Sequence, residues 1–162
     1  MTAATRTDRA ERLIAASAER LFSCWTDPAM LTHWLPPRGM AGRVEVFDPT
    51  PGRPFRMVLS HEDPAEGAGG GEAVIAGLFV AVDPPRHLAF VSRFDSEAPG
   101  FQGEMRMDWH FDPVRSDPGG FDPMGRATRV RVIASGVPAG IPAEDHVDGM
   151  AASLTQLAAL VE

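Results

Sequence analysis

The spacing of hydrophobic residues changes part-way along the chain. Between residues 42 and 135, apolar residues recur mostly at every second position, which is the spacing of β-strands with one buried face. Towards the C-terminus, Met150, Leu154 and Leu157 recur at intervals of four and three, which is the spacing of an amphipathic helix. The sequence therefore predicts a sheet followed by one long C-terminal helix.

Six strands are predicted in the sheet region, because turns rich in Asp-Pro, Pro-Gly or glycine separate the apolar runs. No helical pattern lies between these strands, so antiparallel hairpins are favoured over parallel crossovers. The long apolar content of the third strand also predicts burial on both of its faces. The six are Arg43–Val46, Phe55–Leu59, Glu72–Val82, His87–Phe94, Met105–Phe111 and Arg126–Ser135.

One strand and two short helices are predicted before the sheet region. Ser17 is a good N-cap for the first helix, and Asp27 followed by proline is a common helix start. The prolines after Trp34 end the second helix. The predicted elements are a strand at Arg9–Ala16 and helices at Ala18–Trp25 and Pro28–Trp34.

This order of elements predicts a single α+β domain over residues 1–162. A curved antiparallel sheet needs a cover for its concave face, and the C-terminal helix is the only predicted element long enough to provide it. Trp25 and Trp34 then either form a wall of a space under that helix or plug one end of the sheet.

Composition and charge exclude several classes of function. The net charge is −7, which argues against nucleic acid or an anionic membrane as the main partner. The longest apolar run, Ala73–Val82, is too short to span a bilayer, and no secretory signal is visible, so a cytoplasmic location is expected. Cys24 is the only cysteine, which excludes a disulfide framework, and we expect it to be inert core.

Neither a metal nor a cofactor is expected, and no catalytic residue is predicted. His61–Asp63 is interpreted as a surface turn, and Asp112, Asp117 and Asp122 as turn residues rather than calcium ligands. Asp108 and His110 share one strand face and could form an acid–base pair. They alternate with the apolar row, however, so we expect them to face solvent or a neighbouring strand.

Six segments form an ordered set of motifs along the chain: Arg12–Phe22, Trp25–Pro28, Leu31–Pro37, Gly71-Glu72, Val82–Phe90 and Asp148–Leu157. Together they resemble a known family, the homologues of the activator of the ninety-kilodalton heat-shock chaperone ATPase. The likeness covers nearly the whole chain and keeps the order of the motifs. Two departures are Leu35-Pro36, where the family usually has tryptophan and glycine, and Met150, where tryptophan is commoner.

The resemblance implies the helix-grip fold of the START and birch-pollen-allergen superfamily. In that fold a curved antiparallel sheet of about six to seven strands wraps around the C-terminal helix, with two short helices after the first strand. An apolar cavity between sheet and helix is then expected, although the same residues are equally suited to plain core. The expected lining is Trp34, Met57, Phe90, Met105, Met107, Trp109, Met150, Leu154 and Leu157.

Three functions remain open at this point. The first is binding of a small apolar molecule without catalysis. The second is a cyclase- or aromatase-like enzyme that uses one polar residue inside the same cavity. The third is an interaction protein that contacts a chaperone or a second copy of itself. A perturbed histidine or carboxylate in the cavity would favour the enzyme, and a wall of only aliphatic and methionine side chains would favour the binding protein.

Overall fold

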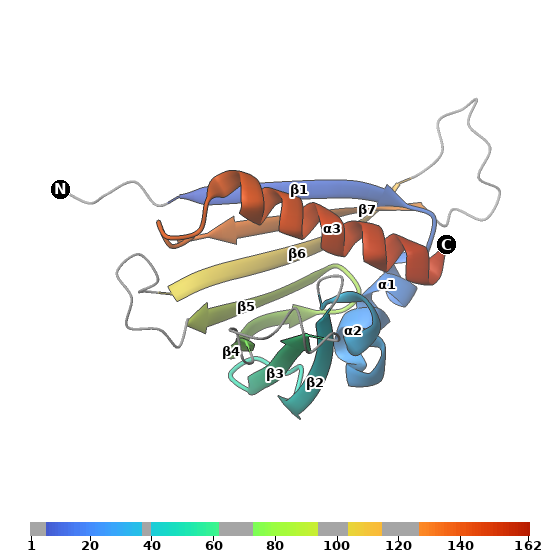
Figure 1. Ribbon diagram of the computed structural model, residues 1–162. Coiled ribbons are helices and arrows are strands. Elements are labelled where there is room, and N and C mark those ends of the chain that lie inside the picture. Colours follow the sequence, from blue (N-terminus) through green and yellow to red (C-terminus); the bar gives the residue numbers. More distant parts are fainter. Residues whose placement is uncertain (1–5, 37–39, 62–72, 94–103, 115–126) are drawn as a thin grey trace.

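A computed structural model describes residues 6–36, 40–61, 73–93, 104–114 and 127–162 (Figure 1). The described residues form an α+β fold, as predicted. In chain order the elements are β1 (Thr7–Ile14), α1 (Ala18–Thr26), α2 (Pro28–Trp34), β2 (Met40–Phe47), β3 (Pro54–His61), β4 (Ala73–Asp83), β5 (His87–Arg93), β6 (Glu104–Val114), β7 (Ala127–Ser135) and α3 (Ala143–Val161).

The seven strands of the described residues form one antiparallel sheet in the order β1-β7-β6-β5-β4-β3-β2. Strands β2 to β7 follow one another as neighbours, which confirms the predicted hairpins, and β1 pairs with β7 at one edge. Helix α3 runs across one face of the sheet, while α1 and α2 lie together at one end (Figure 1). This is the arrangement of a helix-grip fold.

Capping residues explain where the short helices begin. The Ser17 side chain accepts a hydrogen bond from the Arg20 amide at 3.2 Å, which starts α1. The Asp27 amide then donates to the Ser23 carbonyl and closes α1, while its carboxylate accepts from the Ala29 amide at 3.0 Å and opens α2. One aspartate therefore sets the corner between the two helices, as the Asp-Pro pair predicts.

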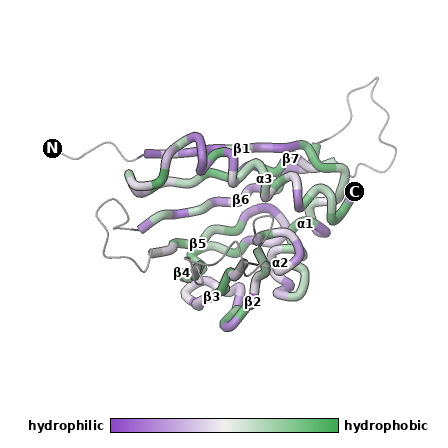
Figure 2. The backbone as a smooth tube through the Cα atoms, in the orientation of Figure 1, coloured by the Kyte–Doolittle hydropathy of each residue, from purple (hydrophilic) through white to green (hydrophobic). Residues whose placement is uncertain are grey.

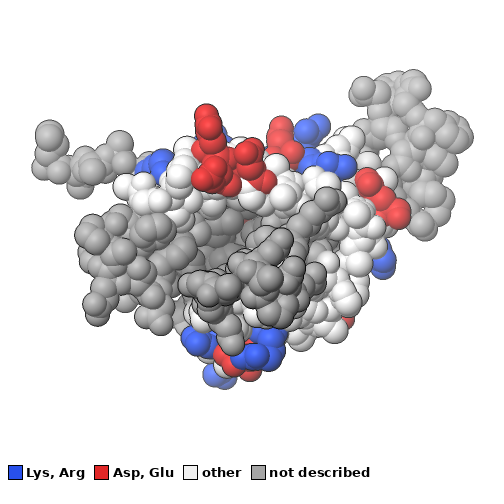
Figure 3. Space-filling view, in the orientation of Figure 1, with Lys and Arg blue, Asp and Glu red and all other residues white. Residues whose placement is uncertain are grey.

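Acidic residues lie at the start of the covering helix. Glu144 and Asp145 occupy the first turn of α3, where a negative charge is stabilised by the positive end of the helix dipole. With Asp148 they are all exposed, and acidic side chains gather on this part of the surface (Figure 3). The polar side of α3 is thus turned to solvent, and its apolar side faces the sheet.

Alternating burial along the central strands places the core on the α3 side of the sheet. In β6, Met105, Met107, Trp109 and Phe111 are buried, and the residues between them are more exposed. The edge strand β1 is mostly hydrophilic (Figure 2). Charged side chains on an edge strand oppose pairing with further chains.

Strand β4 does not have the burial that its apolar sequence predicts. Phe79 is fully buried, but its neighbours Leu78 and Val80 are 46% and 39% exposed. The prediction of burial on both faces is therefore wrong. The sheet is antiparallel, and the helices of the described residues lie over one face only, so they leave the opposite face of β4 uncovered.

Two predictions on turns fall outside the described residues: the segment Glu62–Asp63, and the aspartates Asp117 and Asp122. Among the helices that the structure describes, none has the length and apolar content needed to cross a lipid bilayer.

Gly77 allows a close approach between β4 and its neighbours, and Gly77→Ala should destabilise the fold. A Cβ atom there would collide with the Val91 carbonyl oxygen and lie 3.1 Å from Cε1 of Phe55. Because the first obstacle is backbone, we expect a loss of about 1–3 kcal/mol in the free energy of unfolding, measured by urea denaturation.

The matched control is Gly149→Ala, at an exposed position inside α3 where an added Cβ meets nothing within 4 Å. Helix propensity should stabilise this variant by about 0.5–1 kcal/mol. Equal effects of the two substitutions would contradict the tight packing at Gly77.

Candidate functional site

A cavity of about 300 Å³ lies between α3 and the sheet. Its sheet wall is made by side chains of β3, β5 and β6, and the adjoining part of β4 completes it. These residues are Leu59, Phe90, Ser92, Met105, Met107 and Trp109, with Val74, Ile75 and Ala76 from β4. Trp25, Leu35 and Ile141 also contribute to the wall. Most of this lining is apolar.

The helix wall explains why space remains there. His146, Gly149, Met150 and Ser153 lie at positions i, i+3, i+4 and i+7 of α3, so they share one face of the helix. Gly149 and Ser153 are small and leave volume that larger side chains would fill. Further along the helix, Leu154 and Leu157 are fully buried and pack in solid core.

The C-terminal half of α3 is also fixed by polar contacts. The Gln156 side-chain amide donates hydrogen bonds to the carbonyl oxygens of Trp34, at 2.5 Å, and Pro36, at 2.9 Å. The Ala15 amide donates to the Glu162 carboxylate at 3.1 Å. These contacts hold the helix end against α2 and the end of β1, so that the open space lies under its N-terminal half.

The cavity wall contains five of the nine residues predicted to line it: Phe90, Met105, Met107, Trp109 and Met150. The other four, Trp34, Met57, Leu154 and Leu157, do not line it and lie in the hydrophobic core, each at most 1% exposed. Hydrophobic periodicity identifies the buried face correctly, but it does not distinguish a side chain beside a void from one in solid packing.

Trp25 stands in the wall where Trp34 was expected. The rings of Trp25, Trp34 and Trp109 contact one another edge to face, with centroids 5.2–5.4 Å apart. Trp34 is fixed behind the other two, because its indole nitrogen donates to the Cys24 carbonyl at 3.1 Å. The three tryptophans therefore both plug one end of the sheet and supply two rings to the cavity.

Among the described residues that line the cavity, His146 is the only ionisable one, and it is paired with Asp8 on β1. Nδ1 of His146 lies 2.8 Å from the Asp8 carboxylate, which also accepts a hydrogen bond from Arg6 at 3.0 Å. Burial alone would raise the pKa of Asp8, but the hydrogen bonds from His146 and Arg6 outweigh it and lower that pKa. The ionised Asp8 therefore holds the proton on Nδ1 of His146 and leaves Nε2 as the free ring nitrogen.

Sequence reasoning missed this pair because its members lie 138 residues apart. Asp8 is on β1 and His146 near the start of α3, and only the docking of the helix brings them together. The sequence signal that could have indicated the pair was Asp8, an acidic residue at a position of β1 that faces the core.

The other polar candidates lie away from the cavity. Asp108 and His110 alternate with the buried row of β6 and therefore face the opposite side of the sheet, as expected. Asp112 accepts a hydrogen bond from Arg131. Cys24 is buried, and burial raises the pKa of its thiol, which suits inert core.

Comparison with known proteins identifies the family. A family model described as "Activator of Hsp90 ATPase homolog 1-like protein" matches residues 15–162. The chain belongs to this family. A search of curated proteins finds no match.

Solved structures share the fold over nearly the full chain. A protein from Chromobacterium violaceum is similar at 29% identity and a TM-score of 0.80, with 96% of each chain covered. One from Rhodobacter sphaeroides has 21% identity and a TM-score of 0.70, with 97% of each chain covered. An AHSA1-like protein from Aeromonas hydrophila has 18% identity and a TM-score of 0.68, with 95% of this chain and 90% of the other covered. The latter two support the fold alone.

Substitutions in the solid core and in the cavity wall should lower the free energy of unfolding by different amounts. Leu154 is surrounded by core, so Leu154→Ala should lower the free energy of unfolding by about 2–5 kcal/mol. Met107 borders the cavity and has fewer contacts to lose, so Met107→Ala should cost about 2 kcal/mol or less. Urea denaturation of both variants measures the difference. A Met107→Ala loss as large as that of Leu154→Ala would mean that the cavity is filled by packing in solution.

Proposed function

We propose that this family member binds a small, largely apolar molecule in the cavity under the N-terminal half of α3. The observation that carries the proposal is the largely apolar wall around a half-open space of about 300 Å³. This volume is at the lower end of the range for small-molecule sites. It suits a compact ligand with one or two rings rather than a long lipid chain.

The wall also supports a particular class of ligand. Met105, Met107 and Met150 are flexible and polarisable, and they can adapt to ligands of different shape. Trp25, Trp109 and Phe90 offer ring edges and faces to an aromatic ligand. His146 supplies a nitrogen for one polar group of the ligand. We therefore expect an aromatic or alicyclic molecule with a single hydroxyl, amine or carbonyl group.

Binding is tested with the neutral aromatic probe N-phenyl-1-naphthylamine. The chain has three tryptophans and no tyrosine, and Trp25 and Trp109 line the cavity. Binding should therefore quench the tryptophan emission while the fluorescence of the probe increases. Ser153→Phe places a ring in the cavity and should abolish saturable binding.

The matched control is Ala152→Phe, which adds a ring at the neighbouring exposed position of α3, outside the cavity wall. It should bind the probe as the wild type does. Equal binding by Ser153→Phe would place the probe elsewhere. Absence of binding to the wild type would overturn the proposal and favour a domain that acts through its surface, on a chaperone or a second copy.

A second candidate function is catalysis by the pair of His146 and Asp8. A carboxylate that orients an imidazole is the usual arrangement of a general base, and His146 is one of the residues that line the cavity. Such a base would remove a proton from a carbon next to a carbonyl group, the kind of step that cyclisation of a polyketide requires.

Deuterium exchange tests this second function. Benzoylacetone carries an acidic CH₂ group between two carbonyls, and its exchange in D₂O can be followed by NMR. If His146 is a base, the wild type should accelerate exchange above buffer and His146→Gln should not. Probe binding by both proteins, with exchange accelerated by neither, would leave binding as the function and exclude this catalysis.

A further inference from the structure

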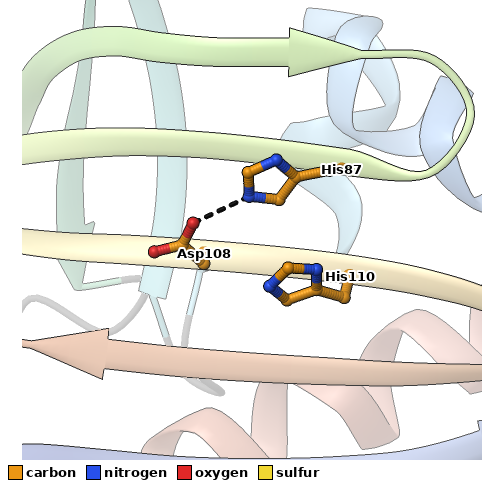
Figure 4. Close-up of side chains that lie close together, drawn as sticks. All are labelled: His87, Asp108 and His110. Carbon is orange, nitrogen blue, oxygen red and sulfur yellow. Dashed lines mark hydrogen bonds and ion pairs between the residues drawn. The ribbon is translucent and has the colours of Figure 1, made fainter.

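Three potential metal ligands lie together on the face of the sheet opposite α3 (Figure 4). They are His87 on β5 and Asp108 and His110 on β6. Their ligand atoms all lie within 4.8 Å of one another, and all three side chains are half-buried. This cluster is separate from the cavity and from every residue in its wall.

Strand register brings the three residues together. His87 pairs directly with His110 across β5 and β6, and Asp108 is the next residue on the same face of β6. The two imidazole rings are stacked, with centroids 4.6 Å apart and an angle of 13° between the ring planes. Nε2 of His87 is 2.7 Å from Oδ1 of Asp108. Because these strands are central in the sheet, the backbone under the cluster is rigid.

We propose that His87, Asp108 and His110 bind a divalent transition-metal ion of the zinc type. Two imidazoles and one carboxylate are ligands that zinc takes in proteins, whereas Mg²⁺ and Ca²⁺ prefer sites made of oxygen atoms. Three protein ligands also leave one position for water. That coordination is typical of functional zinc sites rather than of closed structural ones.

The two imidazole rings must turn before both can bind one ion, because a metal lies in the plane of a ligating imidazole and these two ring planes are stacked within 13° of parallel. The distances between the ligand atoms must change as well. Zinc bonds to nitrogen and oxygen are about 2.0–2.2 Å long, so two ligand atoms at a tetrahedral zinc lie about 3.3 Å apart. His87 Nε2 and Asp108 Oδ1 lie 2.7 Å apart, within hydrogen-bond distance, and the ion would replace this contact. Rotation of the half-buried side chains gives the extra separation without moving the strands.

Arg106 contacts the proposed ligand Asp108 without being a ligand itself. Its Nε donates to Oδ2 of Asp108 at 2.9 Å, and its Nη2 to Oδ1 at 3.1 Å. Such a contact orients a ligating carboxylate. Its positive charge also opposes a cation, so the site should bind zinc more weakly than one made of thiolates.

The test is a Zn²⁺ titration of the full-length protein without a histidine tag, followed by competition with a chromophoric chelator. We expect one zinc per chain with His87 and His110 intact, and no binding of Mg²⁺. His87→Gln and His110→Gln should each weaken zinc binding at least tenfold. His33→Gln is the matched control, because His33 is exposed and lies outside the cluster, and it should leave zinc binding unchanged.

Thermal melting gives a second readout, because the ion joins β5 to β6. Zinc at about a hundredfold excess over Kd should raise the Tm by about 5–10 °C in the wild type and in His33→Gln only. A cooperative melt of each glutamine variant without zinc, at a Tm close to that of the wild type without zinc, shows that the variants are folded. Absence of zinc binding to the wild type, or equal affinity in His87→Gln and His110→Gln, would overturn the site.

Discussion

A single helix has to bury the apolar face of a sheet that is wider than the helix. Helix α3 spans Ala143–Val161 and lies along the β1 and β7 side of a seven-stranded sheet (Figure 1), so it cannot fill the whole concave face with its own side chains. The short helices α1 and α2 cover one end, where the tryptophan rings complete the packing. The cavity lies in the part of the concave face that neither α3 nor the two short helices fill. It therefore results from the fold and from the small residues Gly149 and Ser153 of α3.

Polar contacts decide the position of that helix. Near its C-terminus, Gln156 bonds to backbone carbonyls of α2 and the segment after it. Near its N-terminus, His146 bonds to Asp8 on β1. Both contacts are directional, unlike the hydrophobic packing between them, so they fix how α3 lies over the sheet. One of these two anchors, His146, also lines the cavity, so a residue that holds the helix is also the one assigned the polar contact in the proposed binding.

Most of the fold was predictable from local sequence signals, because they agree with its tertiary packing. The caps at Ser17 and Asp27 and the alternation in β6 each depend on neighbouring residues only. The burial of β4 was predicted wrongly, since an apolar run does not reveal whether a second layer covers the sheet. None of the helices in the described part of the chain covers that face, and Leu78 is exposed.

The site was predicted less completely, for physical reasons that particular residues illustrate. Gly149 and Ser153 matter through the volume they leave empty, and an empty volume has no hydrophobic signal. Trp25 and Trp34 are equally apolar, and the docking of α1 against α2 decides which ring borders the cavity. His87 joins Asp108 from 21 residues earlier through strand register, which a search within one strand does not find.

The tryptophan cluster also gives the protein an optical signature of its native packing. Trp25, Trp34 and Trp109 are the only tryptophans of the chain, and their rings are in mutual contact at fixed, steep angles. Indole transition dipoles held so close in a chiral arrangement couple with one another and produce a strong circular dichroism signal in the near ultraviolet. That signal depends on the relative angles of the rings, so it separates loss of side-chain order at this end of the sheet from loss of the strands themselves.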